Sequence, residues 1–310
     1  MRKRYFYALA VLTSTVLLIA GLAHWCGQAS DGVNRSHATW VWDLNALLDG
    51  SGGSPDDVVA FLREREVKYV YLHTDDNMTR GETNDRFRSF IRKAGQAGIE
   101  VHALGGERDW VLPDKRSRLH DFLARVAEYN DSAQPEERFT GIHLDVEPYL
   151  LKQWKTDPES VVRHWIGMMD EFTSFARMRG LETGVDLPFW LDRVPASAED
   201  GEAVTLDRWM MSAVDSVALM SYRDQAGGNN GVLALVQDEM DHARAAGRTV
   251  WVGLNVAPDS DNILTFREEG NGSFRRVADR IRRKYGDSPA FGGIAVHDLA
   301  NWMRIDPPSE

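Results

Sequence analysis

The chain has 310 residues, 43% of them hydrophobic, and carries a formal net charge of −11. This length suffices for one large hydrophobic core or two smaller ones. The acidic balance argues against binding to nucleic acid or to anionic polymers, and it favours neutral or cationic substrates. Because Cys26 is the single cysteine, the sequence offers neither an intramolecular disulfide nor a cysteine-based metal cluster.

The N-terminal segment predicts export from the cell. Three basic residues at positions 2–4 precede an uncharged apolar run that extends to about residue 25. This order is typical of a signal peptide or of an uncleaved signal anchor, so residues 1–29 are assigned to one of the two. We therefore expect the protein in a bacterial cell envelope, membrane-anchored or periplasmic, or outside the cell, with membrane contact only through this segment. Residues 30–37 are polar and contain glycine and serine, which predicts a linker.

The rest of the chain alternates between short apolar runs and longer amphipathic segments. Helix signals support several boundaries, such as Ser54 and Pro55 at one start and Gly98 or Gly180 after an end. In chain order the pattern predicts strand 38–43, helix 54–66, strand 67–73, helix 84–97, strand 100–104, helix 116–130, strand 139–148, helix 159–178, strand 182–187, a short helix 206–212, strand 216–221, helix 233–246, strand 249–255, helix 273–285, strand 292–297 and a short helix ending near residue 302.

Eight strands that alternate with helices predict a single α/β domain, a (β/α)8 TIM barrel over residues 38–305. A doubly wound open sheet is the main alternative. That fold would call for a glycine-rich phosphate loop after an early strand, and the sequence has none. Nothing in the composition divides residues 38–305 into two domains.

The segment 139–148 carries the most informative pattern. Apolar and polar residues alternate from Ile142 to Glu147, so in a strand His143, Asp145 and Glu147 share one face. A solvated edge strand could show the same alternation. Two carboxylates and an imidazole followed by a proline favour a polar row leading to the C-terminal end of a barrel strand, where such barrels keep their active sites.

The C-terminal ends of the other predicted strands also carry polar and aromatic side chains, whereas the opposite loops are short and plain. Aromatic rings stack on sugar rings, and carboxylates perform acid or base chemistry at a glycosidic bond, so this combination predicts a glycan site. For the tryptophans, packing in the core remains the alternative, and it is the expectation for Trp40 and Trp165. The candidate substrate-binding residues are His143, Trp42, Asp75, Trp110, Tyr149, Asp186, Trp190, Arg223, Asp224, Asn255, His297 and Trp302.

Three segments resemble the family 18 glycoside hydrolases, the chitinase-like barrels. Residues 139–147 resemble that family's strand-four motif, and Gly141, Asp145 and Glu147 match it. The Leu-Met-Ser-Tyr stretch that ends at Tyr222 is similar to the Met-x-Tyr of the sixth strand, and Gly-Gly-Ile-Ala-Val at 292–296 is similar to the last strand.

The chain departs from this family at four positions. Thr140 and His143 replace the first two aspartates of the strand-four motif. Arg223 stands where the sixth strand usually has an aspartate, with Asp224 one place later, and His297 stands where the last strand usually has a tryptophan. These departures predict a divergent relative rather than a plain chitinase.

The resemblance implies a glycosidase that acts on N-acetylated amino sugars without a cofactor. Glu147 would be the general acid that protonates the leaving oxygen. Asp145 would orient a substrate 2-acetamido group that attacks the anomeric carbon, and Tyr222 would donate a hydrogen bond to that group.

Three alternatives remain open from the sequence. Glu147 could work with Asp224 or Asp186 in a two-carboxylate glycosidase. The barrel could bind carbohydrate without cleaving it, and Asp145 could be only a buried acid paired with His143 or Arg223. A divalent ion could also be held by a set of five residues, although no typical ligand spacing supports it: His73, Asp75, His143, Asp145 and His297.

Overall fold

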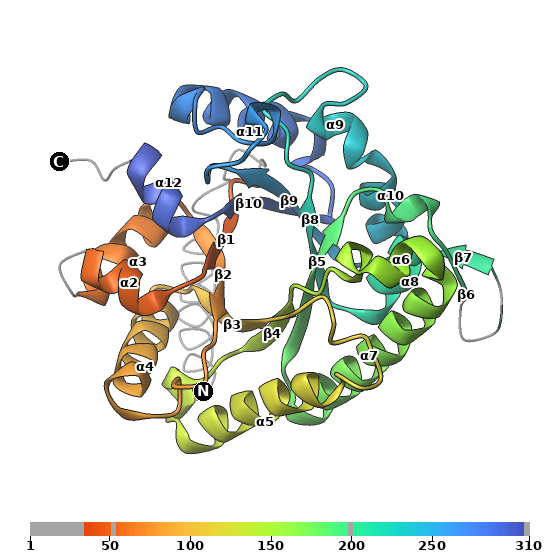
Figure 1. Ribbon diagram of the computed structural model, residues 1–310. Helices are drawn as coiled ribbons and strands as arrows, with labels where there is room; N and C mark the ends of the chain where they lie inside the picture. The colour runs from red at the N-terminus through yellow and green to blue at the C-terminus, as the bar shows by residue number, and fades with distance from the viewer. Residues whose placement is uncertain (1–33, 51–53, 198–200, 202, 307–310) are drawn as a thin grey trace, which may run out of the picture. The chain divides into compact units, whose positions relative to one another are not determined.

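The computed structural model describes residues 34–50, 54–197, 201 and 203–306. In this part of the chain eight parallel strands close into a barrel, and helices surround it (Figure 1). The predicted (β/α)8 barrel is therefore confirmed. The predicted signal or anchor segment lies outside the described residues. Within them, no helix is long and apolar enough to cross a membrane.

The barrel strands follow one another around the barrel in chain order, and the last strand pairs with the first. A separate antiparallel pair, β6 (Pro195–Ser197) and β7 (Ala203–Thr205), lies between the fifth and sixth barrel strands in the sequence and was not predicted. The barrel strands are β1 (His37–Val41), β2 (Val67–His73), β3 (Glu100–Gly105), β4 (Gly141–Leu144), β5 (Glu182–Pro188), β8 (Ser216–Met220), β9 (Thr249–Asn255) and β10 (Phe291–His297).

The predicted helices are present in the described residues, but the predicted helix 233–246 is divided into α9 and α10, and two short helices (α2 and α6) are additional. Local signals explain several ends: Ser54 Oγ accepts a hydrogen bond from the backbone of Asp56, and the longest helix ends at Gly180, whose φ is +65°. The helices are α2 (Leu44–Gly50), α3 (Pro55–Glu64), α4 (Gly81–Gln96), α5 (Ser117–Ser132), α6 (Lys152–Thr156), α7 (Pro158–Arg179), α8 (Leu206–Ala213), α9 (Val232–Leu235), α10 (Gln237–Ala246), α11 (Gly270–Tyr285) and α12 (Leu299–Ile305).

Two hydrophobic clusters form the core. The larger one lies between the barrel and its helices and includes Trp165, as predicted. The smaller one fills the barrel interior, and Trp40 belongs to it, so its predicted core role is also confirmed. Its members are Ala38, Trp40, Tyr71, Leu104, Ala218, Trp251 and Ala295.

Two glycines make room for two histidines inside the barrel. Strand register places Gly141 beside His102 and Gly184 beside His143. A Cβ atom on Gly141 would lie 2.5 Å from Nε2 of His102, and one on Gly184 would lie 2.4 Å from Nδ1 of His143. Since real Cβ atoms do not approach other atoms so closely, each imidazole occupies space that only a glycine leaves free.

The first barrel strand is held at its start by a buried histidine. Nδ1 of His37 donates to the carbonyl of Arg65 at 2.6 Å, and its Nε2 accepts from Arg282 at 2.7 Å. Burial, and next the Arg282 charge, lower the pKa of His37 to about 3. His37 therefore stays neutral at physiological pH. It belonged to the predicted linker, so the strand begins one residue earlier than expected.

We expect Gly184→Ala to lower the free energy of unfolding by about 1–3 kcal/mol, because the new methyl group would overlap the ring of His143. Denaturant titration measures this change. Gly167→Ala on α7 is the control, since its Cβ would meet nothing within 4 Å and alanine raises helix stability by about 0.5–1 kcal/mol. Equal effects of the two substitutions would contradict the packing argument.

We expect His37 to make the folded state less stable as the pH falls from 6.5 toward 3. The unfolded chain binds a proton at His37 near pH 6.5, whereas the folded chain resists it until about pH 3. The loss is at most about 1.4 kcal/mol per pH unit. Denaturant titrations at pH 7, 6 and 5 should give a steeper fall for the wild type than for His37→Gln, and parallel curves would refute the assignment.

Candidate active site

The predicted alternation of apolar and polar side chains from Ile142 to Glu147 is present. Ile142, Leu144 and Val146 are buried in the cluster between barrel and helices. The regular strand stops at Leu144, although the backbone N–H of Asp145 still donates to Gly105 at 3.0 Å. A 3-10 turn, Pro148–Leu150, follows directly after Glu147. The polar row thus runs from the barrel interior up to its C-terminal end.

His143 forms the buried base of this row. Its side chain is fully buried, and its ring stacks on Tyr71 with 3.7 Å between centroids. Its Nε2 lies 3.0 Å from Oδ1 of Asp186, whose other oxygen accepts from Nε1 of Trp40 at 3.1 Å. Asp186 is only 3% exposed. Neither side chain presents a free surface, which argues against direct contact of His143 or Asp186 with substrate.

Burial controls the charge of this pair. It lowers the pKa of His143 to about 3 and raises the pKa of Asp186 well above its usual value. The facing atoms lie 3.0 Å apart, but neither makes a hydrogen bond of good geometry within the described residues. Burial thus disfavours the charged form of both groups.

Asp145 lies one step higher in the row and is half-buried. Burial, and then the charges of Asp186, Glu147 and Glu107, raise the pKa of Asp145 well above its usual value. Its Oδ1 is buried and has no hydrogen-bond partner among the described residues. A carboxyl group in this state can carry a proton and has one oxygen free for a ligand.

Glu147 ends the row beside three aromatic rings. Its Oε2 accepts a hydrogen bond from the hydroxyl of Tyr149 at 2.7 Å. The ring of Tyr149 packs 5.1 Å from Trp190, and Trp190 packs 6.1 Å from Trp154. We call Tyr149, Trp154 and Trp190 the aromatic wall. Trp154 lies on α6, a helix that the sequence analysis did not predict, and it was missed for that reason.

Tyr222 lies just beyond β8 and is half-buried. Burial raises the pKa of Tyr222 well above its usual value, and the carboxylates of Asp186, Asp145 and Glu147 raise it further. The phenol therefore keeps its proton and can donate a hydrogen bond. Its electrostatic coupling to the row on β4 supports the predicted grouping of Tyr222 with Asp145 and Glu147.

A second set of side chains connects the ends of β1, β10 and β9. Nε1 of Trp42 donates to Nε2 of His297 at 3.1 Å. The proton of the neutral His297 ring is therefore on Nδ1, and Nδ1 donates to Oδ1 of Asn255 at 3.2 Å. Burial lowers the pKa of His297 and favours this neutral form. Asn255 is 3% exposed and Trp42 is 38% exposed. Of the three, Trp42 therefore offers the largest accessible surface to a ligand.

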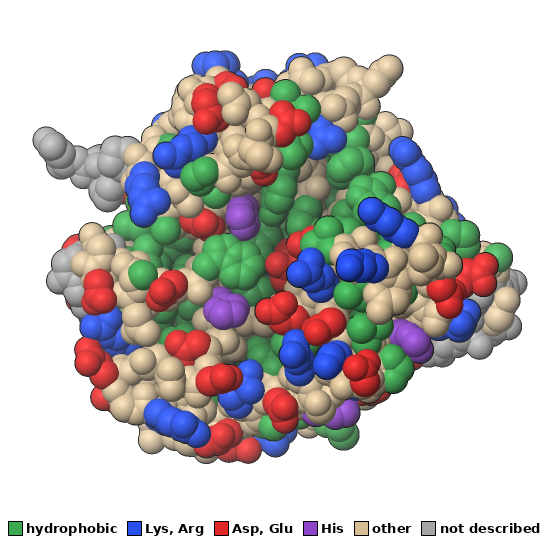
Figure 2. Space-filling view, in the orientation of Figure 1, with side chains coloured by type: hydrophobic (Ala, Val, Ile, Leu, Met, Phe, Trp, Pro, Cys, Tyr) green, Lys and Arg blue, Asp and Glu red, His purple; other side chains and the backbone are tan. Residues whose placement is uncertain are grey.

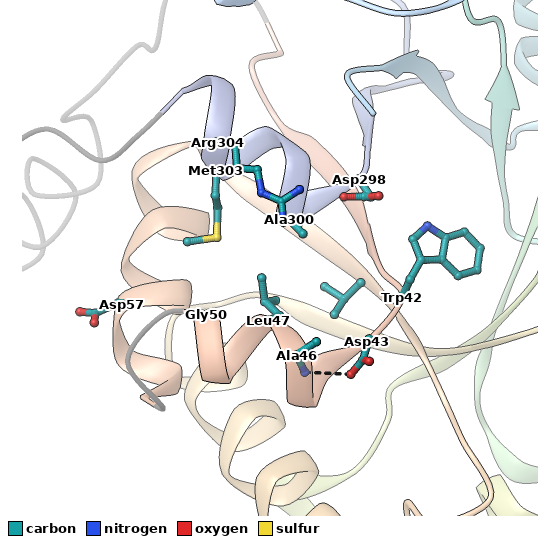
Figure 3. A pocket seen from close by; sticks show the side chains of 11 residues that line it. Trp42, Asp43, Ala46, Leu47, Gly50, Asp57, Asp298, Ala300, Met303 and Arg304 are labelled. Atoms are coloured by element: carbon teal, nitrogen blue, oxygen red, sulfur yellow. Dashed lines mark hydrogen bonds between the residues drawn. The ribbon is translucent and has the colours of Figure 1, made fainter. Parts of the chain in front are cut away.

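Figure 2 shows one end of the barrel, hollowed at its centre, with acidic side chains and histidines around the hollow. Beside Trp42 a separate pocket of about 590 Å³ lies between α2 and α12 (Figure 3). Asp43 and Asp298 line it next to Trp42, and Asp57 lies at its far end. Trp42 thus lines this pocket and also donates to His297.

Two predicted site tryptophans are in the core instead. Trp110 is 6% exposed and packs on Phe122 of α5. Trp302 is 1% exposed and packs between Phe61 and Phe274. Neither has a free ring face for a sugar, so their predicted substrate-binding role is wrong. Both follow a strand end in the sequence, but the chain turns outward there and directs them toward the helices.

Three further candidates are engaged locally. Asp75 Oδ1 accepts from the backbone of Asn77 at 2.7 Å in the loop after β2. The Arg223 guanidinium donates to the carbonyl of Tyr222 at 2.7 Å and lies 5.5 Å from the ring centre of Phe189. The backbone of Asp224 donates to the carbonyl of Ile263 at 2.9 Å. These contacts shape the loops around the hollow, and a direct role for these three side chains in binding stays a prediction.

Comparison with known proteins supports the fold. No family model and no curated protein matches the chain. A GH18 chitinase from Cycas revoluta in complex with (GlcNAc)3 matches with a TM-score of 0.51 and 12% identity, over 86% of this chain and 95% of that one. Its complex with allosamidin gives 0.52 at the same identity and coverage. The chain covers 63% of catalytic domain 2 of the Ostrinia furnacalis group II chitinase, with a TM-score of 0.46 and 14% identity.

The TM-scores of 0.51 and 0.52 to the Cycas revoluta chitinase show a shared barrel fold. The predicted resemblance to the chitinase-like barrels is thus confirmed at the level of the fold, in a chain that has diverged far in sequence.

We expect His143 and Asp186 to be energetically coupled. Removing either partner, as in His143→Asn or Asp186→Asn, should cost about 3–5 kcal/mol of stability because the other group remains buried without its partner. The double variant should lose less than the sum of the two losses, with a coupling of about 1–3 kcal/mol. Denaturant unfolding of the three variants measures this, and strict additivity would show that the two groups do not interact.

Proposed function

We propose that the protein is a glycoside hydrolase that acts on a glycan containing N-acetylated amino sugars. The observation that carries this proposal is the arrangement at the end of β4. There Glu147 is held by the Tyr149 hydroxyl at 2.7 Å, next to the aromatic wall, and Asp145 keeps one buried oxygen unpartnered among the described residues. Acid, orienting carboxyl and stacking surface are the parts that hydrolysis of such a glycan requires.

In the proposed mechanism Glu147 donates its proton to the glycosidic oxygen as the bond from that oxygen to the anomeric carbon breaks. The carbonyl oxygen of the substrate's own 2-acetamido group forms the new bond to that carbon. Asp145 binds the acetamido N–H through its free oxygen, and the Tyr222 hydroxyl donates to the acetamido carbonyl. Water then opens the cyclic intermediate, and the Glu147 carboxylate accepts a proton from that water.

Asp145 fits the orienting role better than Asp186 fits that of a nucleophile. Asp186 is 3% exposed, and its two oxygens face Trp40 and His143. An attack by Asp186 on a sugar would require both contacts to break. These contacts favour the substrate-assisted mechanism over a two-carboxylate mechanism that uses Asp186.

Charge narrows the class of substrate. The chain carries a net charge of −11, and the carboxyl group of Asp145 is near enough to those of Asp186, Glu147 and Glu107 to be affected by their charges. A polyanionic glycan would be repelled there, so a neutral or cationic one is favoured. The basic and apolar N-terminal segment supports the further proposal that the protein is exported and meets this glycan in the cell envelope or outside the cell.

We expect Glu147→Gln to lower the rate of glycan hydrolysis by about 10²–10⁴-fold, because the amide cannot supply the proton. Release of reducing ends from N-acetylated oligosaccharides and peptidoglycan fragments measures the rate. Glu128→Gln on α5 is the matched control, since Glu128 is exposed on the outer surface. If the wild type binds these glycans but cleaves none of them, the barrel is a binding module and the proposal fails.

A further inference from the structure

The N-terminal end of the barrel, opposite the candidate active site, contains a second group of ionisable side chains. Glu100 and Glu182 are the first residues of β3 and β5, and His102 follows Glu100 on β3. Strand register aligns His102 with Gly141 on β4 and Gly141 with Glu182 on β5. Because Gly141 has no side chain, the ring of His102 can lie across β4 and approach Glu182.

Each of these three side chains offers a ligand atom, and the three atoms all lie within 4.8 Å of one another. Among the residues that the structure describes, this is the group of histidine and acidic side chains that satisfies such a spacing. The five residues considered from the sequence do not form such a group: His143 faces Asp186, and His297 is bound to Trp42 and Asn255.

His102 supplies the imidazole of this group. The side chain is fully buried, and neither ring nitrogen has a hydrogen-bond partner within the described residues. Nε2 points toward Glu182 Oε2 but lies 3.5 Å from it, which is long for a hydrogen bond. Two ligands of a tetrahedral zinc ion, with bonds of about 2.0–2.1 Å, lie roughly 3.3 Å apart. The observed separation is close to that value.

A neighbouring hydroxyl can orient one of the two carboxylates. The hydroxyl of Tyr69 donates to Oε2 of Glu182 at 3.3 Å and can orient the carboxylate.

An ion can reach this group from solvent. A hollow of about 340 Å³ opens at this end of the barrel, and Tyr69, Glu182, Asp215 and Trp251 are among its lining residues. The side chain of Glu182 is 48% exposed, whereas that of His102 is fully buried. The group therefore combines a buried ligand, His102, with a solvent-accessible ligand, Glu182.

We propose that Glu100, His102 and Glu182 form a binding site for a divalent transition metal ion, with zinc as the best match to one imidazole and two carboxylates. The bound ion would connect β3 to β5 across β4 and so fasten the base of the barrel. The proposal is independent of the hydrolase proposal, because the two sites are at opposite ends of the barrel.

The test titrates Zn²⁺ into the purified full chain, treated with a chelator and then freed of it, and follows binding by calorimetry and stability by thermal unfolding. We expect one ion per chain and a higher Tm with Zn²⁺. Mg²⁺ should bind far more weakly, since it prefers oxygen ligands only. Co²⁺ in the same site should give a visible absorption band that Zn²⁺ removes by competition.

Glu182→Gln is the informative variant, because Glu182 lies at the exposed rim and its loss leaves the barrel interior intact. It should weaken Zn²⁺ binding by about tenfold or more, whereas Glu128→Gln on α5 should bind as the wild type does. Absence of one-to-one Zn²⁺ binding in the wild type would overturn the proposal. Equal binding by the wild type, Glu182→Gln and Glu100→Gln would also overturn it and leave His102 and Glu182 as neighbours without a metal.

Discussion

Space inside the barrel is the constraint on which the rest of the structure depends. The eight strands enclose several large side chains, and two imidazoles fit only because glycines stand beside them. Gly184 leaves room for His143, and Gly141 leaves room for His102. The interior is thereby divided into levels, with one histidine near the base and the other below the candidate active site. Glu147 can lie at the rim because the level beneath it is already filled.

The exchange of an aspartate for His143 has a physical explanation in these surroundings. An aspartate at this position would lie beside Asp186, and burial already disfavours the charged form of that acid. Two acids this close cannot both ionise. An imidazole at this position is neutral and stacks on Tyr71. The substitution thus replaces electrostatic repulsion with a neutral, well-packed ring beneath Asp145.

Local sequence signals were enough to predict the barrel and the row of polar side chains His143, Asp145 and Glu147. Strand periodicity and helix-ending glycines located the eight strands, and the alternation from Ile142 to Glu147 placed the carboxylates at the correct end. The same signals could not decide between Trp42, which is exposed, and Trp110, which is buried, because both follow a strand and only the path of the loop separates them. The group of Glu100, His102 and Glu182 could not be predicted from the sequence for a different reason. These residues come together through the register of β3, β4 and β5, with Gly141 between them. The spacing of residues along the chain does not determine that register.

The hydrogen bonds from Trp42 through His297 to Asn255 have a consequence for the thermodynamics of binding. They fix the orientation of the indole before any ligand arrives. A ring that is already immobile loses little rotational entropy when a sugar stacks on it, so more of the contact energy appears as affinity. A phenylalanine at this position would present a similar apolar face but could rotate freely. Replacing Trp42 by phenylalanine would therefore make the entropy of association less favourable and leave its enthalpy largely unchanged.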